Sequence, residues 1–101
     1  MIIYNITVKI HPHIQEQWIV WLKEVHIPEI LRTGCFTNAR ILLLLEMDDS
    51  DGLTYALQFH AESKALYNQY IEKFAGIINK KSVEKWGGRY VDFRTVMQVV
   101  N

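Results

Sequence analysis

Three side chains of this chain combine a titratable or charged group with a position from which it could act on a ligand: His26, His60 and Arg94. His26 lies near the end of a predicted helix, between Glu24 and Glu29, and a nearby carboxylate can make an imidazole a general base near neutral pH. A histidine at that position can also cap the last carbonyls of its helix. Because one histidine without a partner in the sequence is a weak catalytic signal, the capping role is favoured for His26.

His60 is the second candidate for a catalytic role. It lies at the end of a predicted strand, and we expect Asp92 and Arg94 beside it on one face of a sheet. Arg94 offers a planar set of charged donors that suits a carboxylate or an enolate. The alternative for His60 is a half-buried strand histidine that hydrogen-bonds across a dimer interface.

A ligand site built on these groups needs further polar contacts. The residues predicted to contact a ligand are Arg94, Asn5, Tyr90, Asp92 and Gln58. We also predict that His26 and Arg94 line one pocket together with Asn5 or Tyr90, although they lie far apart in the sequence.

Other residue patterns that could bind a metal or a cofactor are incomplete. His11-Pro12-His13 supplies only two ligands beside a turn, and no third histidine or cysteine follows at ligand spacing. The aspartates between Asp48 and Asp51 lack the downstream ligands of a calcium loop and suit a turn. Cys35 has no partner motif, and no glycine-rich phosphate loop is present. We therefore expect no metal and no cofactor.

The composition limits the class of protein. A chain of 101 residues with 50% hydrophobic content can form one core, and we expect residues 1–101 to make a single domain. Eleven basic and eleven acidic side chains balance to zero, which provides no electrostatic basis for binding nucleic acid or an anionic membrane. A single cysteine fits a reducing compartment, and the N-terminal residues lack the pattern of a signal peptide. A cytoplasmic location is expected.

The hydrophobic periodicity predicts four strands and two helices. The strands are expected at 2–10, 36–47, 53–60 and 89–100, and the helices at 13–27, with a further turn through Leu31, and from a cap at Ser63 to Trp86, with a break near Gly76. Asp51-Gly52 suits the turn between the second and third strands. The order βαββαβ predicts a ferredoxin-like α+β plait, in which both helices cover one face of an antiparallel sheet of strand order 4-1-3-2.

One face of such a sheet would stay uncovered. Alternate residues of a strand point to opposite faces, so the unbroken apolar run from Ile41 to Leu45 in the second strand predicts burial on both faces. Two packed open faces would supply that burial, so a homodimer is expected. Three sets of side chains are predicted to face the helices, namely Tyr4, Ile6 and Val8 of the first strand, Tyr55, Leu57 and Phe59 of the third, and Val91, Phe93 and Met97 of the fourth. The residues between them, with Asn38 and Arg40, would face away and either enclose a ligand cavity or pair across the interface.

Several motifs spread along nearly the whole chain resemble a known family. They are Trp18-x-x-Trp-Leu-Lys-Glu-x-His26-Ile-Pro28, Thr33-Gly34-x-Phe36, Thr54-Tyr55-Ala56 and Trp86-Gly87-Gly88-x-Tyr90-Val91-x-Phe93-Arg94-Thr95. The pattern resembles a family of small bacterial proteins known only as a domain of unknown function. That family is similar to the dimeric α+β barrel superfamily, which includes antibiotic-biosynthesis monooxygenases, muconolactone isomerases, haem-degrading monooxygenases and EthD-like proteins. The resemblance implies a face-to-face dimer and a pocket between sheet and helices in each subunit.

The resemblance does not imply a reaction, because one fold hosts many functions. Haem-degrading members use an asparagine on the first strand, which Asn5 could match, and a haem-ligating histidine on the second helix. The segment from Ser63 to Trp86 contains no histidine, which argues against haem degradation. Two functions stay open: a small-molecule binding protein or cofactor-free enzyme for an apolar or aromatic ligand, and a non-catalytic dimeric interaction module.

Overall fold

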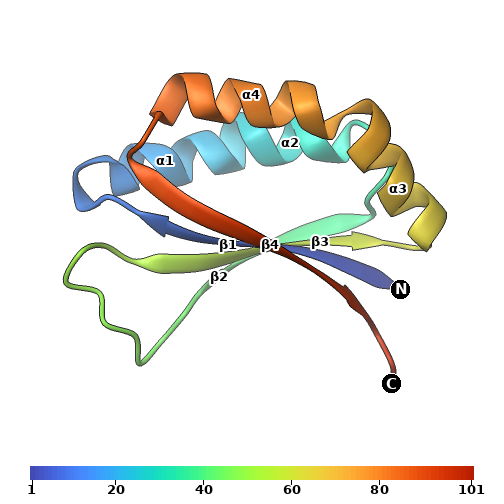
Figure 1. Ribbon diagram of the computed structural model, residues 1–101, viewed down its shortest axis with the longest axis horizontal. Helices are drawn as coiled ribbons and strands as arrows, with labels where there is room; N and C mark the ends of the chain where they lie inside the picture. Colours follow the sequence, from blue (N-terminus) through green and yellow to red (C-terminus); the bar gives the residue numbers. More distant parts are fainter.

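A computed structural model describes residues 1–101 as one antiparallel sheet with every helix on the same face (Figure 1). The strands are β1 (Ile2–Ile10), β2 (Asn38–Leu43), β3 (Thr54–Ala61) and β4 (Tyr90–Gln98), in the spatial order β2-β3-β1-β4. The helical segments are the 3-10 turn η1 (Pro12–Ile14), α1 (Gln15–Trp21), the π-helix η2 (Leu22–His26), α2 (Ile27–Leu31), α3 (Lys64–Lys73) and α4 (Ala75–Trp86). The predicted βαββαβ plait is confirmed.

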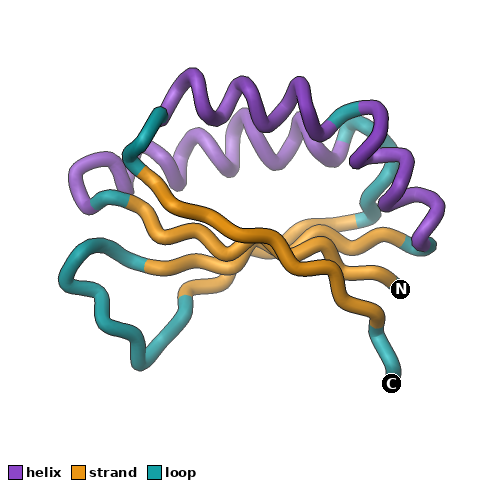
Figure 2. The backbone as a smooth tube through the Cα atoms, viewed as in Figure 1, coloured by secondary structure: helices purple, strands orange, loops and turns teal.

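Each predicted helix consists of shorter segments. The first changes its winding twice between Gln15 and Leu31, and the second divides at Phe74, two residues before the predicted break at Gly76. Ser63 caps α3 as predicted, because its hydroxyl accepts a hydrogen bond of 3.2 Å from the Leu66 N–H. The segments nevertheless form one continuous layer above the sheet (Figure 2). None of them combines the length and the hydropathy that a bilayer span requires.

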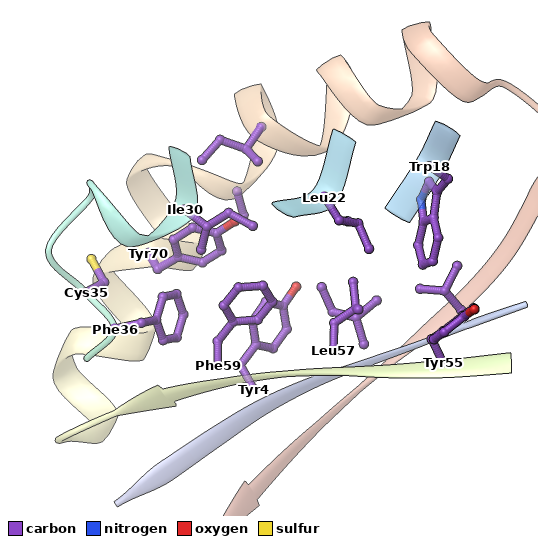
Figure 3. Packing of buried hydrophobic residues seen from close by; sticks show 14 of the residues in the cluster. Tyr4, Trp18, Leu22, Ile30, Cys35, Phe36, Tyr55, Leu57, Phe59 and Tyr70 are labelled. Atoms are coloured by element: carbon purple, nitrogen blue, oxygen red, sulfur yellow. The ribbon is translucent and has the colours of Figure 1, made fainter. Parts of the chain in front are cut away.

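The core lies between the sheet and this helical layer. Tyr4, Ile6 and Val8 of β1 are buried there together with Tyr55, Leu57 and Phe59 of β3, as predicted. The labelled side chains in Figure 3 show how Trp18 and Leu22 reach down from the helices onto the strand residues. Alternation along two hydrogen-bonded strands therefore identified their inner face correctly.

The predicted orientation of β4 is wrong. Directly opposed residues of antiparallel strands lie on the same face, and Arg94 is opposite Ile6 while Asp92 is opposite Val8. Tyr90, Asp92, Arg94 and Val96 therefore lie on the helical side, and Val91, Phe93 and Met97 lie on the open side. Phe93 is 61% exposed there. The hydropathy pattern predicted the wrong inner face because β4 is an edge strand, and the apolar residues of an edge strand are not required to face the core of their own subunit.

The open face of the sheet carries the apolar side chains that the helices do not cover. It includes Ile3 of β1, Leu42 of β2, and Val91, Phe93 and Met97 of β4. β2 is shorter than the predicted 36–47, and Leu45, which follows it, is 76% exposed. The apolar run from Ile41 to Leu45 is therefore not buried on both faces within one chain.

The loop before β3 depends on one glycine. Gly52 has a φ of +131° and lies against β1, so that a Cβ atom added to it would be 2.0 Å from the Ile10 carbonyl oxygen. A Gly52→Ala substitution is expected to cost about 2 kcal/mol of unfolding free energy, because it combines backbone strain with a main-chain clash. Urea unfolding measures this cost. Gly88→Ala, where the added Cβ meets open space, is the control and should change stability by less than about 0.5 kcal/mol.

Candidate functional site

A cavity of about 200 Å³ lies between the helical layer and the half of the sheet formed by β1 and β4. Its apolar wall comes from Ile6, Val8, Trp18, Trp21, Leu22, Leu57 and Val83. Its polar lining consists of His26, Asn79, Ser82, Tyr90, Asp92 and Arg94. Apolar walls with a few convergent polar groups are the usual character of a small-molecule site.

The position of His26 follows from the irregular winding of the first helical segment. The Ile27 N–H bonds to the Leu22 carbonyl, five residues back instead of four. Pro28, one residue further on, has no N–H to donate to Glu24, and its ring crowds that carbonyl, which favours the wider turn. The π-helix directs the His26 side chain toward the sheet, and the residue is only 7% exposed.

His26 is held by packing and has no polar partner in the chain. Its ring stacks on Trp21 with centroids 4.4 Å apart and an angle of 20° between the planes. Nδ1 is buried without a hydrogen-bond partner. The ring does not bond to the helix carbonyls, so the capping role favoured by the sequence is not observed.

Burial determines the protonation state of His26. Desolvation lowers the pKa of the imidazole from 6.5 to about 4, with Glu29 opposing the shift and Arg94 adding to it. The ring is therefore neutral at neutral pH. Neutral imidazole carries one N–H donor and one lone pair, and neither makes a hydrogen bond within the chain.

Arg94 and Asp92 lie two residues apart on the inner side of β4 and form an ion pair. Arg94 Nη2 is 3.4 Å from Asp92 Oδ2, and both side chains are partly exposed. Burial alone would lower the pKa of Arg94, but the neighbouring Tyr4 and Asp92 raise it, so the guanidinium stays charged. Burial also raises the pKa of the Tyr4 hydroxyl against the opposing charge of Arg94. The Tyr4 hydroxyl points from the sheet toward the helices and has the Arg94 guanidinium as a neighbour (Figure 3).

The remaining polar wall was not recognised in the sequence, apart from Tyr90. The Ser82 hydroxyl donates a hydrogen bond of 3.4 Å to the Tyr90 hydroxyl, which joins α4 to β4. Asn79, Ser82 and Val83 recur at helical spacing on the side of α4 that lines the cavity. This spacing of three and four residues is the feature of the sequence that could have predicted one shared helix face for them.

The predicted site residues divide between the two sides of the sheet. His26, Arg94, Tyr90 and Asp92 line the same cavity. The others lie on the open face and are Asn5, Gln58 and His60. The expectation that His60 would adjoin Asp92 and Arg94 is wrong, because β4 presents those two side chains to the helices.

The open-face polar residues form a small network of their own. The Asn5 side-chain amide donates to the Thr7 hydroxyl at 3.0 Å, and Gln58 donates to the Asn5 oxygen at 3.4 Å. His60 lies opposite Asn38 of β2, and its Nε2 is buried without a partner. No group of three or more His, Cys, Asp or Glu side chains is arranged to hold a metal ion.

Comparison with solved structures identifies the fold. A dimeric ferredoxin-like protein from an uncultured marine organism is 10% identical, with a TM-score of 0.75 over 99% of this chain and 95% of its own. An EthD-family protein from Bacillus halodurans is 11% identical, with a TM-score of 0.67 over 99% and 100%. A variant of SnoaB, a cofactor-independent oxygenase from Streptomyces nogalater, is 9% identical, with a TM-score of 0.66 over 99% and 93%. At these identities the similarity shows the ferredoxin-like α+β fold alone.

Comparison at the level of sequence identifies the family. No curated protein is a significant match to the chain. The resemblance to a domain of unknown function is confirmed by a family model, described as Domain of unknown function (DUF4286), that matches residues 1–100. Because the match spans nearly every residue, the chain belongs to the DUF4286 family.

Proposed function

We propose that the chain is a small-molecule binding protein, or a cofactor-free enzyme, that holds a small apolar or aromatic ligand in the cavity between the helices and β4. The observation that carries the proposal is the unpartnered, buried His26 imidazole in the same cavity as Arg94. A buried polar group without a partner costs free energy, and a ligand that supplies the missing hydrogen bond recovers it.

The lining assigns a role to each polar group. Trp18, Trp21 and Tyr90 supply aromatic surface on which a planar ligand can pack. Neutral His26 accepts a hydrogen bond from a ligand hydroxyl, and Arg94 donates a hydrogen bond to a ligand oxygen. A cavity of about 150 Å³ admits benzene, so about 200 Å³ suits one substituted aromatic ring. The cofactor-independent chemistry of SnoaB, on the same fold, is consistent with this role.

Thermal unfolding with a panel of single-ring aromatic compounds tests the proposal. At least one compound should raise the melting temperature of the wild type, and the rise should be lost in both His26→Ala and Arg94→Ala. Loss of one hydrogen bond to a charged or buried partner corresponds to a roughly tenfold to hundredfold weaker Kd. His13→Ala and Arg32→Ala, at exposed positions outside the cavity, are the matched controls and should keep the response. Variants that bind every compound as the wild type does would exclude the site.

We also propose that two copies pack through their open sheet faces. Val91, Phe93 and Met97 are exposed on this face beside Ile3, and large apolar patches on soluble proteins mark contact surfaces. The network of Asn5, Gln58 and Thr7 would then lie inside the interface. If no compound in the panel binds and the two faces pack without a cavity, the chain is a non-catalytic dimeric interaction module.

A further inference from the structure

Asp92 changes the electrostatic character of the cavity in a way that bears on its ligand. The only guanidinium in the lining, that of Arg94, is 3.4 Å from the Asp92 carboxylate. The one other ionisable group that could be cationic, His26, is buried beside Trp21 without a counter-ion in contact. The formal charges of the lining therefore add to zero.

A neutral lining disfavours an anionic ligand. An anion that enters the cavity loses its hydration, and the attraction of Arg94 is opposed by the repulsion of Asp92 beside it. An un-ionised hydroxyl meets no such penalty, because it can donate its proton to the lone pair of His26 or to Asp92 and accept a hydrogen bond from Arg94. Because the pKa of His26 is about 4, the imidazole near pH 7 accepts a hydrogen bond from the ligand hydroxyl but does not remove its proton.

We propose that the cavity selects un-ionised aromatic hydroxyl compounds, phenols and enols of one ring, over phenolates and aromatic carboxylates, and that Asp92 determines this selectivity by neutralising Arg94. The inference rests on the proposed function and narrows it to one ligand class. It assigns Asp92 as a specificity-determining residue. It also predicts that removing the Asp92 charge reverses the preference, because Arg94 then becomes an unopposed cation next to the ligand.

The test uses 4-nitrophenol, which ionises near neutral pH and whose phenolate alone is yellow. Titrating wild-type protein into the dye near the pH of half-ionisation should bleach the yellow band, because the bound dye is the phenol. With Asp92→Asn the band should intensify, which corresponds to an approximately tenfold or larger change in the relative affinity for phenolate over phenol. Asp51→Asn, which removes an exposed carboxylate paired with Lys9 on the surface, is the matched control and should bleach the band as the wild type does.

The outcomes separate this inference from the proposed function. A yellow complex with the wild type, unchanged behaviour of Asp92→Asn, or tighter binding of benzoate than of 4-nitrophenol would overturn the selectivity and leave the ligand site in place. Absence of binding by every compound of the aromatic panel would overturn both. Bleaching by the wild type together with intensification of the band by Asp92→Asn would establish the ligand class, and a band that Asp92→Asn leaves unchanged would overturn the role of Asp92.

Discussion

Lowering the pH from 7 to about 4 is expected to destabilise the wild-type chain by about 3 kcal/mol more than it destabilises a His26→Gln variant. The folded-state pKa of His26 is about 4, against 6.5 for the same group without its protein environment. Between these values the unfolded chain binds a proton that the folded chain excludes, so protonation favours unfolding. The contribution of His26 to stability is complete above about pH 6.5 and is lost as the pH falls toward 4.

Urea unfolding at a series of pH values and one fixed protein concentration measures the effect. The other ionisable groups of the chain are the same in both proteins, and the comparison with His26→Gln removes their share of the pH dependence. The difference between the two stability curves should grow between pH 6.5 and 4 and stay constant above pH 7. Parallel curves across that range would show that the imidazole is not buried as a neutral ring.

Replacing Phe93 with glutamate is expected to convert a dimer to a single chain of 11.9 kDa at concentrations where the wild type has twice that mass. Phe93 is exposed on the open face of β4, opposite Thr7 of β1. In a face-to-face dimer the substitution buries a carboxylate without a partner in each copy, at a cost of several kcal/mol per charge. The dimer Kd should therefore rise by at least about a hundredfold.

Light scattering coupled to size-exclusion chromatography measures the mass directly. Val20→Glu is the matched control, because Val20 is 51% exposed on α1, in the helical layer on the opposite side of the sheet. The control should keep the mass of the wild type. A wild type that has the mass of one chain at micromolar concentration would exclude the proposed dimer, since an interface of this kind is expected to be of obligate size.

Local patterns in the sequence were sufficient for the order and the topology of the elements. The two-residue period of β1 and β3 predicted which side chains are buried, and Ser63 and Gly52 marked a helix start and a turn. These features depend on neighbouring residues and on general rules of chain handedness. The family resemblance rested on motifs in the chain itself, and the family model that matches residues 1–100 confirms it.

Only the tertiary structure decided which face of β4 points inward and hence which polar residues meet. Alternation defines two faces of a strand, but the pairing of Ile6 with Arg94 and of Val8 with Asp92 decides which one joins the core. On an edge strand the apolar face can point outward, so the hydropathy pattern predicted the wrong inner face for β4. The low pKa of His26 likewise depends on its burial by segments far apart in the sequence and on a π-helix that no periodicity revealed. Long-range register and desolvation determine this site, and neither is a local property of the chain.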